Sequence, residues 1–293
     1  MIAPATAATV VSAVLGWYDQ HRRDLPWRRP GTSPWGVLVS EFMLQQTPVA
    51  RVREPWLSWL TRWPEPAALA AEAPGEAVRA WGRLGYPRRA LRLHQTAIAI
   101  VQQHGGSVPT ERSDLLALPG VGSYTAAAIA SFAFGQRHVV LDTNVRRVLT
   151  RIALGEEFPA PATTRAEATL AEGFLPRSPE RAARWAVASM ELGAVVCSAR
   201  SPRCGDCPVV RQCAWHRAGR PTYDGPPRRG QTYEGTDRQC RGAVLAVLRG
   251  GGEVPEADLL AEWPEPAQRT RAIESLIADG LAVRTGRGRL TLP

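Results

Sequence analysis

The chain has 293 residues, enough for about two domains, and carries a formal net charge of +9. The sequence contains no lysine, so all 36 Lys and Arg positions are arginine. This charge favours a polyanionic partner such as nucleic acid, the alternative being a protein that is basic for no functional reason. No window of about 18 apolar residues occurs, and no basic residue precedes the apolar N-terminal stretch, which argues against a membrane span or a secretory signal. We expect a monomer in the cytoplasm (bacterial nucleoid).

Apolar residues recur at helical spacing through residues 8–217, and convincing alternating strands are absent there, which predicts an all-α fold. The first helix is expected around Val10, Val14 and Tyr18. The further predicted helices are 34–47, 48–62, 66–71, 74–83, 87–104, 112–117, 123–134, 143–153, 163–173, 179–194 and 208–217.

Composition changes near residues 218–239, where Gly, Pro and Arg replace apolar residues and predict a linker. Residues 240–293 then indicate three helices followed by a glycine-turned hairpin, a small winged-helix-like C-terminal module. This module either contacts DNA or braces the main domain.

The segment LPGVGSYTAAAIA, residues 118–130, places two glycines between helical patterns. It does not follow a strand and lacks the GxGxxG spacing, so a nucleotide-binding loop is excluded. Gly120 and Gly122 would let the backbone turn and expose amides at the next helix start, which form an anion site. The pattern indicates either a helix-hairpin-helix that grips the DNA backbone or a glycine turn without a ligand.

Four cysteines are spaced C-x6-C-x2-C-x5-C, and the fifth, Cys240, lies apart. In an intracellular chain this clustering predicts a metal centre, either an iron-sulfur cluster or zinc held by four thiolates, the alternative being four unrelated buried cysteines. A cluster would make residues 198–213 a rigid basic finger, with arginines as candidate phosphate contacts. The predicted ligands are Cys197, Cys204, Cys207 and Cys213.

Two carboxylates stand in contrasting sequence environments. Glu41 projects from the apolar face of its predicted helix, where a carboxyl resists ionising, so it is a candidate general acid or else a buried partner of an arginine. Asp142 stands at a helix N-cap, where the helix dipole favours the ionised form, although capping alone explains an Asp there. One neutral acid and one carboxylate are what cleavage of an N-glycosidic bond requires.

The motifs SEFMLQQT, LGYPRRA, LPGVGSYTAAAIA, VLDTNVRRVL and MELGAVVCSARSPRCGDCPVVRQC occur in this order, and with them the chain resembles the MutY-type adenine DNA glycosylases of the helix-hairpin-helix superfamily. The resemblance covers residues 8–217 and implies a two-domain helical fold with a cleft between the domains. A six-helix barrel, 30–136, would be inserted into an iron-sulfur cluster domain, 1–29 and 137–217. The resemblance also implies one [4Fe-4S] cluster and excision of adenine mispaired with 8-oxoguanine or guanine, flipped out of double-stranded DNA.

The resemblance further assigns roles by motif. Glu41 would protonate adenine, Asp142 would stabilise the sugar cation, and Tyr124 with Asn144 would support that site. The residues expected to contact DNA or line the adenine pocket are Trp27, Arg28, Gln46, Thr47, Leu84, Tyr86, Gly120, Val121 and Gly122.

Endonuclease III, a relative of that family, uses a lysine at the position of Tyr124 to form a Schiff base and cut the strand. Since this chain has no lysine, base removal without lyase cleavage is expected. Relatives often read adenine with Gln or Glu ten residues before the first cysteine, where this chain has Val187. Residues 222–293 are too few for the MutT-like domain that checks for 8-oxoguanine in many members, so that selectivity is expected to be weaker or to rest on the barrel and the tail.

Two rival functions remain. A glycosylase for thymine opposite guanine also carries tyrosine at the hairpin, but Glu41 favours adenine, which leaves far more easily once protonated. A non-catalytic iron-sulfur protein that only binds DNA is disfavoured by the presence of both Glu41 and Asp142.

Overall fold

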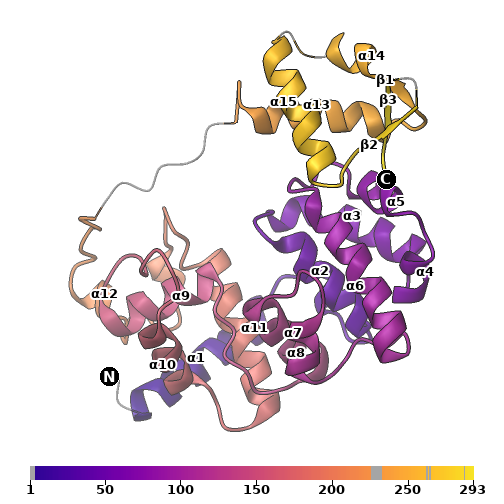
Figure 1. Cartoon of the computed structure of the whole chain (residues 1–293). Helices are drawn as coiled ribbons and strands as arrows, with labels where there is room; N and C mark the ends of the chain where they lie inside the picture. Colours follow the sequence, from indigo (N-terminus) through magenta and orange to yellow (C-terminus); the bar gives the residue numbers. More distant parts are fainter. Residues whose placement is uncertain (1–3, 226–232, 262, 264, 287) are drawn as a thin grey trace. The chain divides into compact units, whose positions relative to one another are not determined.

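The computed structural model describes residues 4–225, 233–261, 263, 265–286 and 288–293, and these are mostly helical (Figure 1). The chain divides into two compact units, each described here by itself. Unit 1 comprises Met1–Val37, Thr110–Leu116 and Val121–Pro226; unit 2 comprises Leu38–Pro109, Ala117–Gly120 and Pro227–Pro293. The domain boundaries expected from the sequence remain predictions.

The helices follow the predicted order closely. They are α1 (Pro4–His21), η1 (Pro26–Arg28), α2 (Pro34–Leu44), α3 (Val49–Arg62), α4 (Pro66–Ala70), α5 (Pro74–Trp81), α6 (Arg88–His104), α7 (Arg112–Ala117), α8 (Ser123–Phe134), α9 (Thr143–Leu149), η2 (Thr150–Leu154), α10 (Arg165–Phe174), α11 (Pro179–Val195), η3 (Cys204–Asp206) and α12 (Ala214–Arg217). From Pro4 to Gly225, all of which is described, there is no strand. None of the helices in the described ranges combines the length and apolar character of a membrane span.

Two helix predictions are corrected. The helix expected over 143–153 ends as α9 at Leu149 and continues as a wider π turn, Thr150–Leu154, which Gly155 closes at φ +75°. The helix expected over 208–217 is reduced to α12, because the preceding residues turn repeatedly to carry the cysteines.

Unit 1 is organised around α11, which packs against α1, α8 and α9. Its buried face meets the valine stripe predicted for the first helix, so that Val10 and Val14 are fully buried beside Leu192. Trp185 stacks on Phe174 of α10 with ring centroids 6.1 Å apart. Burial of this apolar surface is the main stabilising contribution in the unit.

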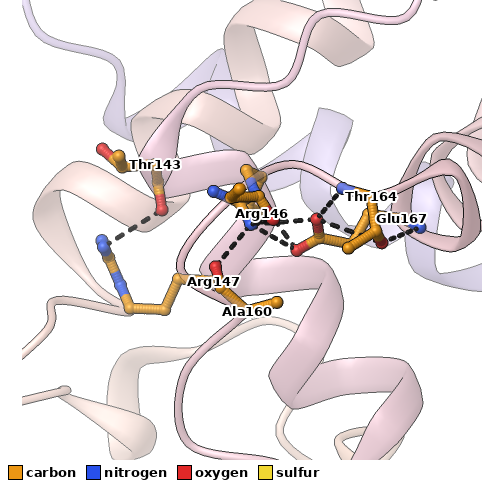
Figure 2. A network of polar contacts seen from close by, with 7 residues as sticks. Thr143, Arg146, Arg147, Ala160, Thr164 and Glu167 are labelled. Carbon is orange, nitrogen blue, oxygen red and sulfur yellow. Dashed lines mark hydrogen bonds and ion pairs between the residues drawn. The ribbon is translucent and has the colours of Figure 1, made fainter.

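A buried ion pair fastens α10 to α9 (Figure 2). Arg146 donates to both carboxylate oxygens of Glu167, at 2.8 and 2.9 Å, and to the backbone oxygen of Ala160 at 2.7 Å. Glu167 also completes a capping box with Thr164 at the start of α10. The pair therefore holds the 155–164 loop and α10 against the helix that Asp142 begins.

Unit 2 is built on α6, against which α4 and α5 pack. Trp59 meets Trp63 and Trp81 edge to face, with centroids 4.6 and 5.7 Å apart, and all three rings are buried. Edge-to-face pairs of this kind add to the stabilisation from burial alone.

The C-terminal part of unit 2 contains α13 (Asp237–Arg249), α14 (Glu256–Ala261), α15 (Pro266–Ala278) and a sheet of order β1-β3-β2, formed by β1 (Val254–Pro255), β2 (Val283–Thr285) and β3 (Arg289–Thr291). The predicted three helices and hairpin are present, with Thr285 paired to Arg289. Sequence analysis missed β1 because two residues give no alternation to detect.

This module is bonded to α5. Arg249 donates from Nε to the Val78 oxygen at 3.0 Å, and the amide of Gly75 donates to the Pro293 oxygen at 2.7 Å. A Cβ on Gly75 would lie 2.4 Å from that oxygen, so the close approach requires glycine. The module was expected either to contact DNA or to brace the main domain, and these bonds support the second role.

We expect Glu167→Gln to lower the free energy of unfolding by ~3–5 kcal/mol, because the variant leaves the Arg146 charge buried without its counter-ion. Urea unfolding followed by tryptophan fluorescence measures the change. Glu172→Gln is the matched control, since Glu172 pairs with Arg137 at the surface and should cost about 1 kcal/mol or less. Equal, small effects of the two variants would show that the buried pair has no structural role.

Candidate active site and cysteine loop

The glycine turn joins α7 to α8. Gly120 has φ +77°, and a Cβ there would lie 2.9 Å from Arg92 Cβ and 3.1 Å from the Phe42 ring, so both conformation and space require glycine. Gly122 was also predicted to let the backbone turn, but its conformation does not require glycine: its φ is −92°, and a Cβ on it would meet no atom of the described residues within 4 Å. The turn therefore needs Gly120, whereas Gly122 leaves open space beside the start of α8.

Tyr124 is the second residue of α8 and lies partly buried. It packs in unit 1 against a small apolar cluster that includes Ala128, Val140 and Ala186. The position therefore offers a phenol and no amine.

Asp142 caps α9, as the sequence predicted. Its Oδ1 accepts from the Val145 amide at 2.6 Å, and its Oδ2 accepts from Asn144 Nδ2 at 2.7 Å. The residue keeps some exposed surface, but burial of the carboxyl group raises the pKa of Asp142, against the opposing effect of these hydrogen bonds. The helix dipole predicted a carboxyl that ionises easily, but desolvation on folding has the larger effect and opposes ionisation.

A polar relay continues from Asp142 into the protein. Asn144 Oδ1 accepts from Arg147 Nη2 at 2.8 Å, and the same guanidinium donates to the Gly193 oxygen at 2.7 Å and the Cys197 oxygen at 2.8 Å. A Cβ on Gly193 would lie 2.7 Å from Asn144 Cβ, so the two helices approach through a glycine. The relay fixes the cap to the end of α11 and to the first cysteine. Sequence analysis did not identify Arg147.

Glu191 is a second residue that sequence reasoning missed. It is fully buried, and it accepts from Arg23 Nε at 2.6 Å and from Arg28 Nη1 at 2.6 Å. Although burial opposes ionisation, hydrogen bonds from Arg23 and the charge of Arg28 lower the pKa of Glu191 to about 2. Arg28 and its neighbour Trp27, which is 6% exposed on η1, are thus held by α11. The sequence did contain a signal for this buried ion pair, because Glu191 lies on an apolar helix face one turn after Val187.

Glu41 lies on α2 and is 6% exposed, in the apolar setting that its helix pattern predicted. The remaining predicted residues of unit 2 flank two turns. Gln46, at φ 54°, and Thr47 follow α2, and Leu84 and Tyr86, at φ 47°, follow α5. Gln46 is exposed and Tyr86 is 43% exposed, whereas Thr47 and Leu84 are buried and joined by a 3.1 Å hydrogen bond.

The predicted site residues are thus divided between the units. Unit 2 holds the group made of Glu41, Gln46, Thr47, Leu84, Tyr86 and Gly120. Unit 1 holds Trp27, Arg28, Val121, Gly122, Tyr124, Asp142, Asn144 and the four clustered cysteines.

The four cysteines line one cavity in unit 1, with about 380 Å³ of space between atoms, part of it open solvent. Arg151, fully buried, donates to Cys197 Sγ at 3.3 Å and to the Ser198 oxygen at 2.8 Å, and stacks over Trp215 at 4.5 Å. In the described part of the chain, no three His, Cys, Asp or Glu side chains converge as they would around a single ion. Four thiols around one cavity, with a guanidinium donating to sulfur, fit a thiolate-bound cluster.

Comparison with known proteins identifies the family of the chain. Residues 39–172 match the model of the HhH-GPD superfamily base excision DNA repair proteins. The chain is 54% identical over 283 residues to the adenine DNA glycosylase of Mycobacterium tuberculosis (strain CDC 1551 / Oshkosh), covering 96% of this chain and 92% of that protein.

Solved structures share the fold. A thermostable thymine-DNA glycosylase matches with a TM-score of 0.66 and 27% identity, covering 73% of this chain and 98% of that one. Endonuclease III in a non-covalent DNA complex matches with a TM-score of 0.64 at 21% identity, covering 75% and 99%. Given the long match to the mycobacterial enzyme, the chain belongs to the adenine DNA glycosylases of the HhH-GPD superfamily.

Proposed function

We propose that this protein removes adenine mispaired with 8-oxoguanine or guanine from double-stranded DNA, in base excision repair. The observation that carries the proposal is the buried, capped carboxyl of Asp142 in a chain that is 54% identical to an adenine DNA glycosylase. The buried carboxyl of Glu41 supplies the second group that the reaction needs.

In the proposed reaction, Glu41 donates a proton to a ring nitrogen of the flipped adenine. The N-glycosidic bond then breaks, and its electron pair leaves with the neutral base, so positive charge develops on the sugar. Asp142 stabilises this cation, and a water molecule adds to the anomeric carbon and loses a proton. The products are free adenine and an abasic site.

The environment of Asp142 suits this role. Burial makes its negative charge costly in the free protein, so a cation that develops beside it gains more than it would in water. The bonds from Asn144 and Val145 fix both oxygens before the cation forms. Tyr124 would support the same site from α8.

DNA would be held by the turns already described. The start of α8 after Gly122, with Val121 and Gly120 before it, would bind a backbone phosphate through helix amides. Gln46 and Tyr86 would enter the duplex, next to Thr47 and Leu84, while Trp27 and Arg28 would line the adenine pocket. Support comes from the exposure of Gln46 and Tyr86 and from the anchoring of Arg28 by Glu191.

The cysteines would hold one [4Fe-4S] cluster. Cys197, Cys204, Cys207 and Cys213 supply the thiolates, and Arg151 would balance their charge through its bond to Cys197 Sγ. When bound, the cluster would supply a rigid covalent tie for the 198–213 loop. No chemical step of base removal is assigned to it.

A rival function is removal of thymine opposite guanine, and the likeness to the thymine-DNA glycosylase structure supports it. Thymine departs without a general acid more readily than adenine does, so a buried glutamate at position 41 favours adenine.

A panel of duplexes tests the function. We expect abasic sites from A:8-oxoguanine and A:G duplexes, and not from T:G, with strand breaks appearing only after alkali because no lysine can form a Schiff base. Gel analysis with and without alkali measures both properties. Faster action on T:G, or efficient nicking before alkali, would contradict the proposal.

Asp142→Asn should reduce the rate of adenine release by roughly 10²–10³-fold while the protein stays folded.

Because burial raises the Asp142 pKa, wild-type activity should fall on the acid side at a pH above the pKa of an ordinary aspartate. The stability contribution of a raised carboxyl is lost as pH rises through that pKa, so the variant should gain stability relative to wild type in that range. Single-turnover rates and thermal melts across pH measure both effects. An unchanged rate of adenine release in Asp142→Asn would show that Asp142 does not stabilise the sugar cation, whereas no release by the wild-type protein would favour a purely DNA-binding role.

Cys204→Ser should lower the iron and acid-labile sulfide bound by the purified protein, both measured under anaerobic conditions, together with the melting temperature. Cys240→Ser is the matched control, because Cys240 is buried in α13 of unit 2, whereas the other four cysteines belong to unit 1. Zinc in place of iron and sulfide in the wild-type protein would show that the thiolates bind a single ion instead.

A further inference from the structure

Two turns of unit 2 hold residues in an unusual backbone conformation. Among the described residues, Gln46, Tyr86 and Arg220 are the non-glycine positions with positive φ. Such conformations carry strain and persist only where the surroundings hold them. Two of the three, Gln46 and Tyr86, are the residues proposed to enter the duplex, and they lie 40 residues apart in the sequence.

One guanidinium joins these turns. Arg89, in the first turn of α6, donates from Nη1 to the backbone oxygens of Phe42, Met43 and Gln45, at 2.7, 3.1 and 2.6 Å. Its Nη2 donates to the Thr47 hydroxyl at 2.9 Å and to the Gly85 oxygen at 3.0 Å. Two of the bonded oxygens lie at the end of α2, two belong to the residues on both sides of Gln46, and one belongs to the residue before Tyr86.

The same side chain supports the Tyr86 ring. The Arg89 guanidinium lies 5.4 Å from the centroid of Tyr86 and 5.2 Å from that of Trp81, whose Nε1 also donates to the Gly85 oxygen at 3.0 Å. These distances are in the range of cation–π attraction. Tyr86 is thus fixed through both its backbone and its ring, although it is 43% exposed.

The charge of Arg89 is costly where it lies. The residue is 5% exposed, and burial lowers the pKa of Arg89 to about 10. In the described ranges its partners are neutral oxygens and aromatic rings, with no ion pair to a carboxylate. An apolar side chain would avoid the cost of the buried charge but would leave the oxygens of both turns without this donor, so the charge serves to hold the two turns rather than to fill the core.

We propose that Arg89 is a positioning residue for recognition of the mispair: its guanidinium sets the Gln46 and Tyr86 turns in the arrangement in which both side chains enter the duplex. The inference rests on the proposed entry of those two residues. It assigns Arg89 no contact with DNA, because Nη1 and Nη2 donate to protein oxygens and Nε is buried.

Binding preference tests the inference. In an Asp142→Asn background, where the base stays attached, we would measure the Kd for A:T duplex divided by the Kd for A:8-oxoguanine duplex. Arg89→Met should lower this preference by a factor of roughly 10, as expected from losing a base-stacking contact. Adding Gln46→Ala and Tyr86→Ala to Arg89→Met should lower it little further, because the three residues act as one unit.

Two further variants separate positioning from stability. Ile100→Ala, on the same helix and fully buried, should lower the melting temperature without changing the preference. Arg89→Lys keeps a cation but lacks the planar fork that reaches both turns, so it should fold and still lose part of the preference. This variant also keeps the test decisive if Arg89→Met does not fold.

A wild-type preference in folded Arg89→Lys, or an equal loss of preference in Ile100→Ala, would overturn the inference. If Gln46→Ala with Tyr86→Ala leaves the preference unchanged in a protein with Arg89 intact, then their entry into the duplex is wrong and the inference fails with it. If that pair lowers the preference but neither Arg89 variant does, the inference alone fails.

Discussion

The polar relay from Asp142 through Asn144 and Arg147 is the interaction on which the arrangement of unit 1 depends. It begins at a carboxyl that burial makes costly to ionise and ends at the backbone oxygens of Gly193 and Cys197. The cap of α9, the end of α11 and the first cysteine are therefore held by one chain of hydrogen bonds. A cluster on the cysteines would stiffen the same chain from its far end, which gives a purely structural reason for placing a metal centre in a hydrolytic enzyme.

Buried arginines join distant segments in the described part of the chain. Arg89, Arg147 and Arg151 each donate to several backbone oxygens from different segments. A guanidinium suits this task because its five donors lie in one plane and can reach two segments at once, whereas an ammonium is a compact point charge. Because all its Lys and Arg positions are arginines, the chain can join distant segments through guanidinium groups, but it has no lysine amine to act as a nucleophile.

The helices, the glycine turn and the burial of Glu41 were predictable because each follows from a local rule: apolar periodicity, positive φ at glycine, and the face on which a residue projects. The Asp142 cap was also local, but the direction of its pKa was not, since desolvation depends on what packs around it. The roles of Glu191 and Arg89 could not be predicted for the same reason, because their hydrogen-bond partners lie far away in the sequence. The π turn after Leu149 has no sequence signal, since helical periodicity continues through it.

Helix α11 carries two of these long-range contacts two residues apart, at Glu191 and Gly193. Glu191 holds the arginines beside Trp27, and Gly193, two residues and about 3 Å further along the axis, receives Asn144 at the Asp142 cap. Any axial slip or rotation of α11 would therefore disturb both the segment proposed to line the adenine pocket and Asp142, the proposed counter-ion. Remote substitutions that shift α11 should accordingly impair substrate capture and bond breaking together, rather than either one alone.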